Sequence, residues 1–180
     1  LLLTAMAIVR EKEIGTMEQL IVSPLKPLEL IIGKLIPFGI IALIQSSLIT
    51  TLAVFWFHIP LRGNVLLLVL STCIYLFTSL GAGLFISTIA ATQQEAMMSV
   101  FLFYMPTFLL SGFAYPIANM PEIIQWLTLV NPMRYFLTII RGIFLKGVGI
   151  GILWPELIVL LFMGITVISS SVLRFRKRMA

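Results

Sequence analysis

Few residues of this sequence could carry out acid–base, nucleophilic or metal chemistry. The 180 residues include seven glutamates, no aspartate, one histidine and one cysteine. The motifs GxxxxGK[ST], HExxH and GxSxG, which mark phosphate loops, zinc proteases and serine hydrolases, are absent from the sequence. His58 has no second ligand or acid nearby in sequence, and Cys73 alone excludes a disulfide or a cysteine metal cluster within the chain. We therefore expect no catalytic, cofactor-binding or metal site.

The ionisable residues concentrate instead in one polar segment, residues 10–34, which separates apolar stretches. Such a segment favours recognition over catalysis, although its charges could also simply mark one side of a membrane. The eight ionisable residues in it are Arg10, Glu11, Lys12, Glu13, Glu18, Lys26, Glu29 and Lys34.

A short helix is predicted inside this segment. Thr16 followed three residues later by Gln19 has the spacing of a capping box, so a helix can begin at Met17. Ser23 precedes Pro24 and should end it. Because so short a helix is not stable alone, we expect it to lie against a membrane or another protein.

The overall composition is that of an integral membrane protein. Hydrophobic residues make up 60% of the chain and charged residues 11%, against roughly 25% charged in an ordinary soluble domain. The net charge of +5 could suggest nucleic-acid binding, but the basic residues stand at the ends of apolar runs rather than in one patch. We expect membrane lipids as partners and no nucleic acid.

The apolar runs predict an all-α, polytopic membrane fold with about four complete transmembrane helices and the end of a preceding one. Residues 1–9 form that end, because at about 1.5 Å per residue they cover less than half of a hydrocarbon core of roughly 30 Å. The chain is thus expected to be the C-terminal part of a longer protein, with residues 1–180 forming a single transmembrane domain. Gly81 and Gly83 offer a small surface for close helix packing. The four complete spans are expected at residues 28–57, 65–91, 96–110 and 152–173.

A second distinctive stretch covers residues 112–149. Pro121 is predicted to open a helix of about ten residues that ends near Asn131, and Pro132 a second of about fifteen that stops at Gly147. Both are shorter than the roughly twenty residues needed to cross a bilayer. We expect a pair of re-entrant or interfacial helices on the outer side, although the residues alone also allow an outer loop.

Basic residues predict the orientation of the spans. If residues 10–34 face the cytoplasm, that side carries eight Lys and Arg residues and the opposite side carries four. Four complete spans after a cytoplasmic segment also return the C-terminus to the cytoplasm. Charge and span count therefore agree on the same orientation.

Two motifs resemble those of type-2 ABC transporter permeases. REKEIGTMEQLIVSP, followed by the Gly-Lys of IIGK, is similar to the cytoplasmic loop of that family, where a Gly-Thr-x-Glu-x-Leu core and a proline form the helix that touches the ATPase subunit. GFAYPIANMPEIIQWLTLVNPMRYFLTIIRGIFLKG resembles the family's segment between its last two spans. The resemblance covers essentially the whole chain.

The resemblance assigns candidate functional residues at both motifs. The ATPase-coupling positions are Glu13, Gly15, Thr16, Glu18, Gln19, Leu20, Ser23 and Pro24. The positions in the outer re-entrant helices are Pro116, Pro121, Trp126, Asn131, Pro132, Tyr135 and Arg141.

The resemblance also implies a function. It points to the transmembrane subunit of an ATP-driven exporter in a bacterial inner membrane, paired with a second permease half in a homo- or heterodimer. Residues 10–34 would be its cytoplasmic coupling loop to an ABC nucleotide-binding subunit or domain. That partner would bind ATP and Mg, so this chain is expected to be no enzyme and to bind no cofactor. An ion-gradient-driven secondary transporter or a non-transporting membrane assembly subunit is the alternative, and no residue identifies a cargo.

Overall fold

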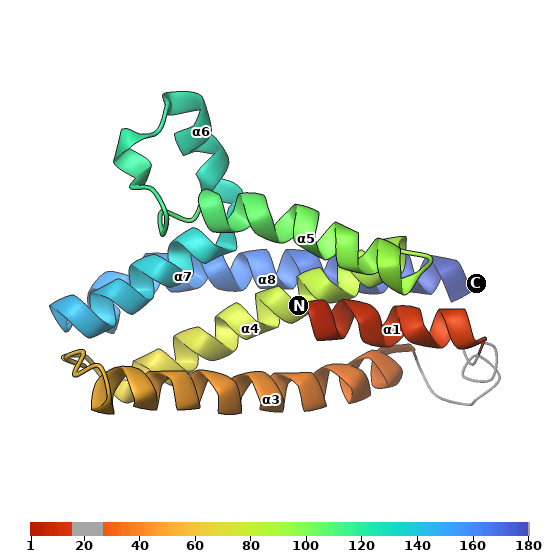
Figure 1. Ribbon diagram of the computed structural model, residues 1–180, viewed down its shortest axis with the longest axis horizontal. Coiled ribbons are helices and arrows are strands. Elements are labelled where there is room, and N and C mark those ends of the chain that lie inside the picture. The colour runs from red at the N-terminus through yellow and green to blue at the C-terminus, as the bar shows by residue number, and fades with distance from the viewer. Residues whose placement is uncertain (16–26, 180) are drawn as a thin grey trace.

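The computed structural model describes residues 1–15 and 27–179, and the regular secondary structure in those ranges is entirely helical (Figure 1). This confirms the all-α class. The long helices are α1 (Leu2–Ile14), α3 (Pro27–Phe55), α4 (Val65–Ile89), α5 (Gln93–Leu109) and α8 (Ile150–Met179). Shorter elements between α5 and α8 are η1 (Ile117–Asn119), α6 (Glu122–Leu127), η2 (Thr128–Val130), α7 (Pro132–Arg141) and the π-helical turn η3 (Gly142–Lys146).

Three to four helices in the described ranges have the length and apolar character needed to cross a membrane. The three continuous ones are Ile31–Phe55, Val65–Ile89 and Ile150–Arg174. A fourth crossing arises if Glu122–Val130 and Pro132–Lys146, which are bent by 88° against each other, count as one broken span. α5 has 17 residues, which at 1.5 Å per residue is about 26 Å, less than a hydrocarbon core of roughly 30 Å. The predicted number of about four complete spans is therefore met in part.

Residues 10–14 of the polar segment are helical, which differs from the loop predicted there, whereas the helix at the end of the segment agrees with the span predicted from residue 28. α1 continues through residues 10–14, and α3 begins at Pro27. A helix can continue beyond an apolar stretch because Glu, Lys and Arg are good helix formers in water. The helix predicted to begin at Met17 lies outside the described residues.

Helix α4 is the centre of the bundle and contacts α1, α3, α5, α7 and, most extensively, α8. Small residues make the close crossings possible. A Cβ on Gly81 would lie 2.5 Å from Cγ1 of Ile168 in α8, and one on Gly83 would lie 2.7 Å from the carbonyl oxygen of Leu1 beside α1. The small surface predicted at these two glycines is confirmed.

Two hydroxyl groups join α4 and α8 directly. Thr78 Oγ1 in α4 donates to the Leu160 carbonyl oxygen at 3.2 Å, and Ser171 Oγ in α8 donates to the Gly81 carbonyl oxygen at 3.2 Å. Polar side chains buried between helices need such partners, because water is absent from the hydrocarbon region. Each hydroxyl also lies within hydrogen-bond distance of a carbonyl oxygen in its own helix, Ile74 for Thr78 and Val167 for Ser171, so these shared bonds add to the close packing of the two central helices.

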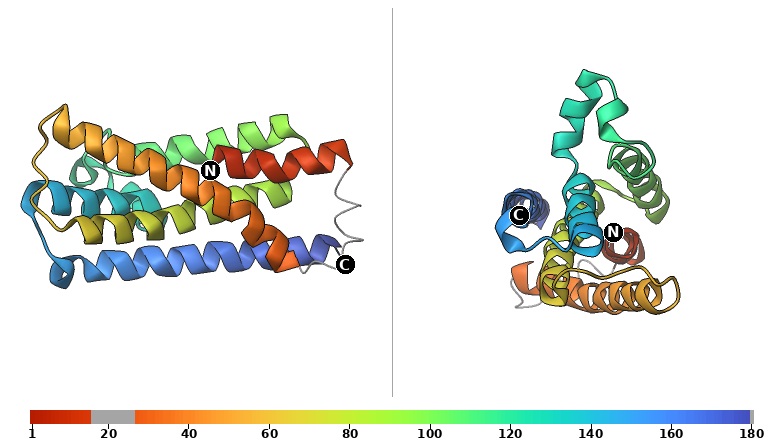
Figure 2. Two further views of the ribbon diagram at one scale, coloured as in Figure 1. Left: turned by 90° about the horizontal axis from the view of Figure 1, so that it is seen from below. Right: turned by 90° about the vertical axis from the view of Figure 1, so that its left-hand side faces the viewer.

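The bundle has two ends that carry different features (Figures 1 and 2). The charged end holds the C-terminus of α1, the N-terminus of α3 and the turn between α4 and α5. The opposite end holds the α3–α4 turn and the turn from η3 into α8. Among the described residues, Glu13 and Gly15 lie at the charged end, and the predicted residues 116–141 lie in the segment between α5 and α8.

The α6–α7 region, residues 117–146, leaves the bundle and returns to it. η1 and α6 stand off to one side of the long helices, whereas α7 lies against them (Figures 1 and 2). The element bounds agree with the two short helices predicted from Pro121 and Pro132. Gly147 follows η3 with φ +63°, a left-handed conformation that suits glycine, which confirms the predicted stop.

Candidate functional site

At the charged end, Glu13 near the end of α1 reaches the first turn of α5. Its Oε1 accepts a hydrogen bond from the Gln93 backbone N–H at 2.8 Å, and its Oε2 accepts one from Gln93 Nε2. Gln93 is the first residue of α5, where backbone N–H groups lack intrahelical partners and the helix dipole favours an anion. A carboxylate on one helix therefore caps the start of another, and we call this pair the Glu13–Gln93 clasp.

The two hydrogen bonds lower the pKa of Glu13, the side chain of Gln93 contributing most and its backbone N–H next. A lowered carboxyl pKa means that the charged form is the one that the clasp favours. The stabilisation is therefore complete above the ordinary pKa of a glutamate and is lost only as the pH falls through the lowered pKa. Glu13 keeps its charge, and the clasp its hydrogen bonds, at neutral pH.

The turn between α4 and α5 is held by its own pair of hydrogen bonds. Thr92 is the N-cap of α5, and its Oγ1 accepts from the Glu95 N–H at 3.2 Å. Glu95 Oε2 in turn accepts from the Ala91 N–H at 2.7 Å. A brief polar turn is what the sequence predicts at residues 91–95, and Thr-x-x-Glu at residues 92–95 has in addition the spacing of a capping box. The capped turn presents Gln93 to Glu13.

A second contact joins α1 to α3. Lys34 Nζ and a carboxylate oxygen of Glu11 form an ion pair, and both side chains are partly buried, 18% and 31% exposed. Such partly exposed pairs contribute only about 0.2–1 kcal/mol, so the main consequence is geometric. The two helices that flank residues 16–26 are attached to each other here, and α1 is attached to α5 through the clasp.

Two of the eight predicted coupling residues, Glu13 and Gly15, are described by the structure. Gly15 directly follows α1 with φ +79°, and a Cβ there would meet nothing within 4 Å. The left-handed backbone rather than lack of space therefore favours glycine at this helix end. The other six coupling residues lie outside the described residues: Thr16, Glu18, Gln19, Leu20, Ser23 and Pro24.

In the α6–α7 region, Asn131 joins two helices. Its Oδ1 accepts from the Met133 N–H at 3.0 Å and caps α7, whose first residue is Pro132. Its Nδ2 donates to the Thr107 carbonyl oxygen in α5 at 2.7 Å. An Asn-Pro pair commonly starts a helix, but the bond to α5 connects residues 24 positions apart and has no local sequence signal.

Tyr135 and Arg141 also fasten α7 to its neighbours. The Tyr135 hydroxyl donates to the Leu129 carbonyl oxygen at 2.9 Å, and an Arg141 guanidinium nitrogen donates to the Gly112 carbonyl oxygen at 3.0 Å, just after α5. α7 is therefore held at its start and at its end by groups near the C-terminus of α5.

The remaining predicted residues of this region lie at the starts of η1 and α6 or on the exposed surface of α6. Pro116 and Pro121 directly precede η1 and α6, and Trp126 in α6 is exposed. Asn131 and Arg141 thus bond to α5 or to the residues just after it from the two ends of α7, whereas Tyr135 bonds to η2 and Trp126 takes no part in these contacts. Within the described ranges, no group of three or more His, Cys, Asp or Glu side chains could hold a metal ion.

Comparison with known proteins places these features in a family. A family model described as ABC-2 type transporter matches residues 1–145. This range includes the charged end of α1, the capped α4–α5 turn and most of the α6–α7 region. No solved structure matches the chain significantly.

Individual relatives carry permease names. The chain is 38% identical to a probable multidrug ABC transporter permease, YbhR, of Escherichia coli over 178 residues, which is 99% of this chain and 48% of that protein. It is 33% identical to the inner membrane transport permease YhhJ of Escherichia coli, covering 98% of this chain and 48% of that protein. It is 26% identical to ABC transporter G family member 20 of Dictyostelium discoideum, covering 98% and 24%. The chain spans about half the length of the bacterial permeases that it matches.

Replacing Glu13 with Ala should expose the Gln93 amide. The substitution removes both acceptors of the clasp, so we expect amide hydrogen exchange at Gln93 to accelerate measurably. In the unmodified protein the protection factor should fall only at pH values below the lowered pKa of Glu13.

Glu95→Ala is the matched control, because it frees the Ala91 amide within the same turn and leaves Glu13 in place. Amide exchange is measured by mass spectrometry on the full-length protein. If Glu13→Ala leaves exchange at Gln93 unchanged, Glu13 does not protect this amide and the clasp does not exist.

Proposed function

The chain belongs to the ABC-2 type transporter family, and on this premise we propose that it is the membrane-spanning part of an ATP-driven exporter. The observation that carries the proposal is the extent of the family match, residues 1–145, which contains both the charged end and the α6–α7 region. The permease names of the relatives support it. Three membrane-length helices in the described ranges supply the membrane-spanning part.

We propose that residues 10–34 couple this chain to a nucleotide-binding subunit or domain, which would bind ATP and Mg. The coupling positions outside the described residues, Glu18 and Gln19 among them, would contact that partner. The contacts of the flanking helices support this role. Since α1 is bonded to α5 by the Glu13–Gln93 clasp and to α3 by the Glu11–Lys34 ion pair, a displacement of this segment would be passed to three helices at once.

Helix α5 provides a route from the charged end to the α6–α7 region. It is bonded to Glu13 at its first residue and to Asn131 near its last turn, through the Thr107 carbonyl oxygen. A rigid helix that is fastened at both ends can pass a shift at one end to the other. We propose that α5 links ATP-driven movement of the coupling segment to α6 and α7.

We propose further that α6 and α7 form a re-entrant pair on the outer side of the membrane. The 88° bend between Glu122–Val130 and Pro132–Lys146 supports this proposal. The hydrogen bond from Asn131, at the bend, to the Thr107 carbonyl oxygen in the last turn of α5 supports it as well. The chain would pair with a second permease half around the translocation route. Such an arrangement needs no cofactor in this chain.

The proposed orientation places the charged end and the C-terminus in the cytoplasm, with a bacterial inner membrane as the location. In the full-length protein with Cys73→Ala, a cysteine replacing Ile14 should react with impermeant thiol reagents only from the cytoplasmic side. A cysteine replacing Gly149, where a side chain meets open space, should react only from the outside. The reverse labelling pattern in right-side-out and inside-out vesicles would overturn the orientation.

Reversing the charge at Glu18 should uncouple the exporter. A mispaired charge at a protein contact costs several kcal/mol, so we expect Glu18→Lys to weaken binding of the nucleotide-binding partner by at least about tenfold. Cargo-stimulated ATP hydrolysis should fall with it, while membrane insertion persists. Glu18→Gln, which removes the charge without reversing it, should have a smaller effect. Normal ATPase stimulation in Glu18→Lys at normal expression would contradict the assigned role.

A further inference from the structure

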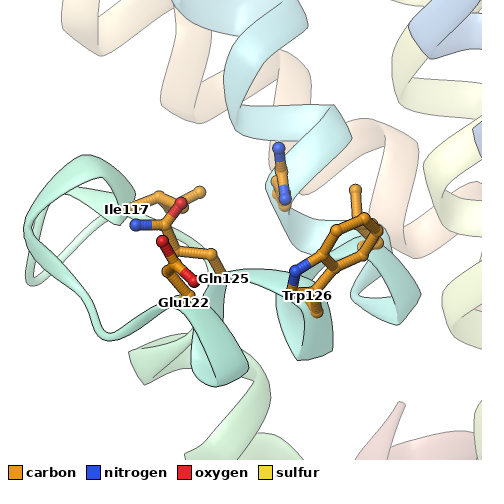
Figure 3. Close-up of a pocket in the computed structure, with 6 residues that line it drawn as sticks. Ile117, Glu122, Gln125 and Trp126 are labelled. Atoms are coloured by element: carbon orange, nitrogen blue, oxygen red, sulfur yellow. The ribbon is translucent and has the colours of Figure 1, made fainter.

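A cavity beside α6 is not used by the coupling scheme. It has a volume of about 420 Å³ and lies between η1, α6, η2 and the first turn of α7 (Figure 3). This volume is within the range of roughly 300–1,000 Å³ that is usual for small-molecule sites. The residues that line it are Ile117, Glu122, Gln125, Trp126, Leu129 and Arg134.

Two opposite charges line this cavity without pairing with each other. Glu122 in the first turn of α6 forms no ion pair in the part of the chain that the structure describes, and neither does Arg134 in the first turn of α7. Two opposite charges that line one cavity without pairing can each bind a group of a ligand. The cavity therefore complements a ligand that has both a negative and a positive group.

The positive side of the cavity is held in place by the protein. Arg134 Nη1 donates to Oγ1 of Thr128, a fully buried residue, whose hydroxyl donates to the Gln125 carbonyl oxygen at 2.6 Å. The guanidinium carbon lies 6.0 Å from the centre of the Tyr135 ring. These contacts orient the guanidinium and leave further N–H donors for a ligand, and a guanidinium binds phosphate, like carboxylate, through paired donors.

The negative side supplies hydrogen-bond acceptors. Gln125 Nε2 donates to the Met120 carbonyl oxygen at 2.8 Å, which leaves the side-chain oxygen of Gln125 as an acceptor. Glu122 and Gln125 lie next to each other in the cavity (Figure 3). A carboxylate beside an amide oxygen suits a primary ammonium group, which has three donors and no acceptor.

The elements that line the cavity, α6 and η2, also expose large apolar side chains. Ile123, Trp126 and Val130 are 85%, 72% and 74% exposed, and Leu127 is exposed as well. Trp is enriched at the boundary between headgroups and hydrocarbon, where its ring contacts acyl chains and its N–H contacts polar groups. In a membrane protein, a charged cavity on a helix that also exposes apolar side chains suits a lipid, whose headgroup is charged and whose chains are apolar.

We propose that this cavity binds the headgroup of a zwitterionic phospholipid with a primary amine, phosphatidylethanolamine. The phosphate lies against Arg134, and the ammonium group lies against Glu122 and Gln125. The acyl chains run along the exposed apolar side chains of α6, among them Ile123, Trp126 and Leu127. The bound lipid holds α6 at headgroup level and so sets the depth of the α6–α7 region. The inference rests on the proposed function only in placing the chain in a membrane, and its test needs neither ATP nor cargo.

Quenching of Trp126 by brominated lipids tests this site. Full-length protein and its Trp126→Phe variant are placed in phosphatidylcholine nanodiscs that contain a small fraction of phosphatidylethanolamine, phosphatidylglycerol or phosphatidylcholine with brominated acyl chains. The difference between the two proteins gives the quenching of Trp126 alone. We expect brominated phosphatidylethanolamine to quench Trp126 most strongly.

Variants separate the two charges. Glu122→Gln should weaken apparent phosphatidylethanolamine affinity by about tenfold, because a charge-assisted hydrogen bond is lost, and should leave phosphatidylglycerol binding unchanged. Arg134→Gln should weaken the binding of both lipids. Arg62→Gln, at the opposite end but outside the cavity, should change neither, and thermal melting confirms that each variant is folded.

Three results would overturn the proposal. Equal quenching by all three lipids would mean that the headgroup is not recognised. Stronger quenching by phosphatidylglycerol that is unaffected by Glu122→Gln would indicate a patch for anionic lipid. Trp126 shielded from every brominated lipid and from aqueous acrylamide would indicate that protein, such as a second copy of this chain, covers the cavity.

Discussion

Close contact between α4 and α8 is the constraint on which the rest of the structure depends. In hydrocarbon, helices gain little from burying apolar side chains, so van der Waals contact at small residues and buried hydrogen bonds hold them together. Gly81 and Gly164 leave no room for a Cβ at this crossing, and Thr78 and Ser171 bond across it. α1 and α5 pack on α4 at the charged end, and α7 packs on both α4 and α8 at the other.

Apolar side chains pack both candidate functional regions onto this bundle, as at Ala5 and Ile86 near the charged end and at Ile139 and Leu157 beside α7, and polar bonds attach each region to α5 as well. Glu13 caps α5 at one end of that helix, and Asn131 bonds to its carbonyl oxygen at Thr107 near the other. Hydrogen bonds of this kind are directional and can exchange partners, whereas the α4–α8 contact resists sliding. We therefore expect the helix ends to move during transport while α4 and α8 keep their relative position.

The sequence was most informative where a local rule acts. Apolar runs predicted the long helices, Asn131 and Pro132 predicted the start of α7, and Gly147 predicted the end of η3. The capped turn at Thr92 and Glu95 also follows a local rule and was recoverable from its spacing. The polarity of residues 10–14 predicts a loop, but α1 continues through them, because Arg, Glu and Lys favour a helix as well as an aqueous surface.

Contacts between distant residues had no such signal. The contacts of Glu13 with Gln93, of Lys34 with Glu11 and of Asn131 with Thr107 depend on how the helices are placed in space, which residue spacing along one helix does not encode. The pairing of Glu13 is the clearest case, since its partner lies 80 residues away.

The central claim is that the energy for transport enters by ATP hydrolysis on a partner at the charged end. The composition of the central helix is consistent with it, since Val65–Ile89 contains no Asp, Glu, Lys, Arg or His, whereas ion-driven carriers generally need an ionisable group within the membrane. Transport in proteoliposomes that contain the full-length permease and its ATPase tests the claim most directly. The account predicts that transport requires hydrolysable ATP and persists when ionophores collapse ion gradients; transport driven by an imposed ion gradient without nucleotide would contradict it.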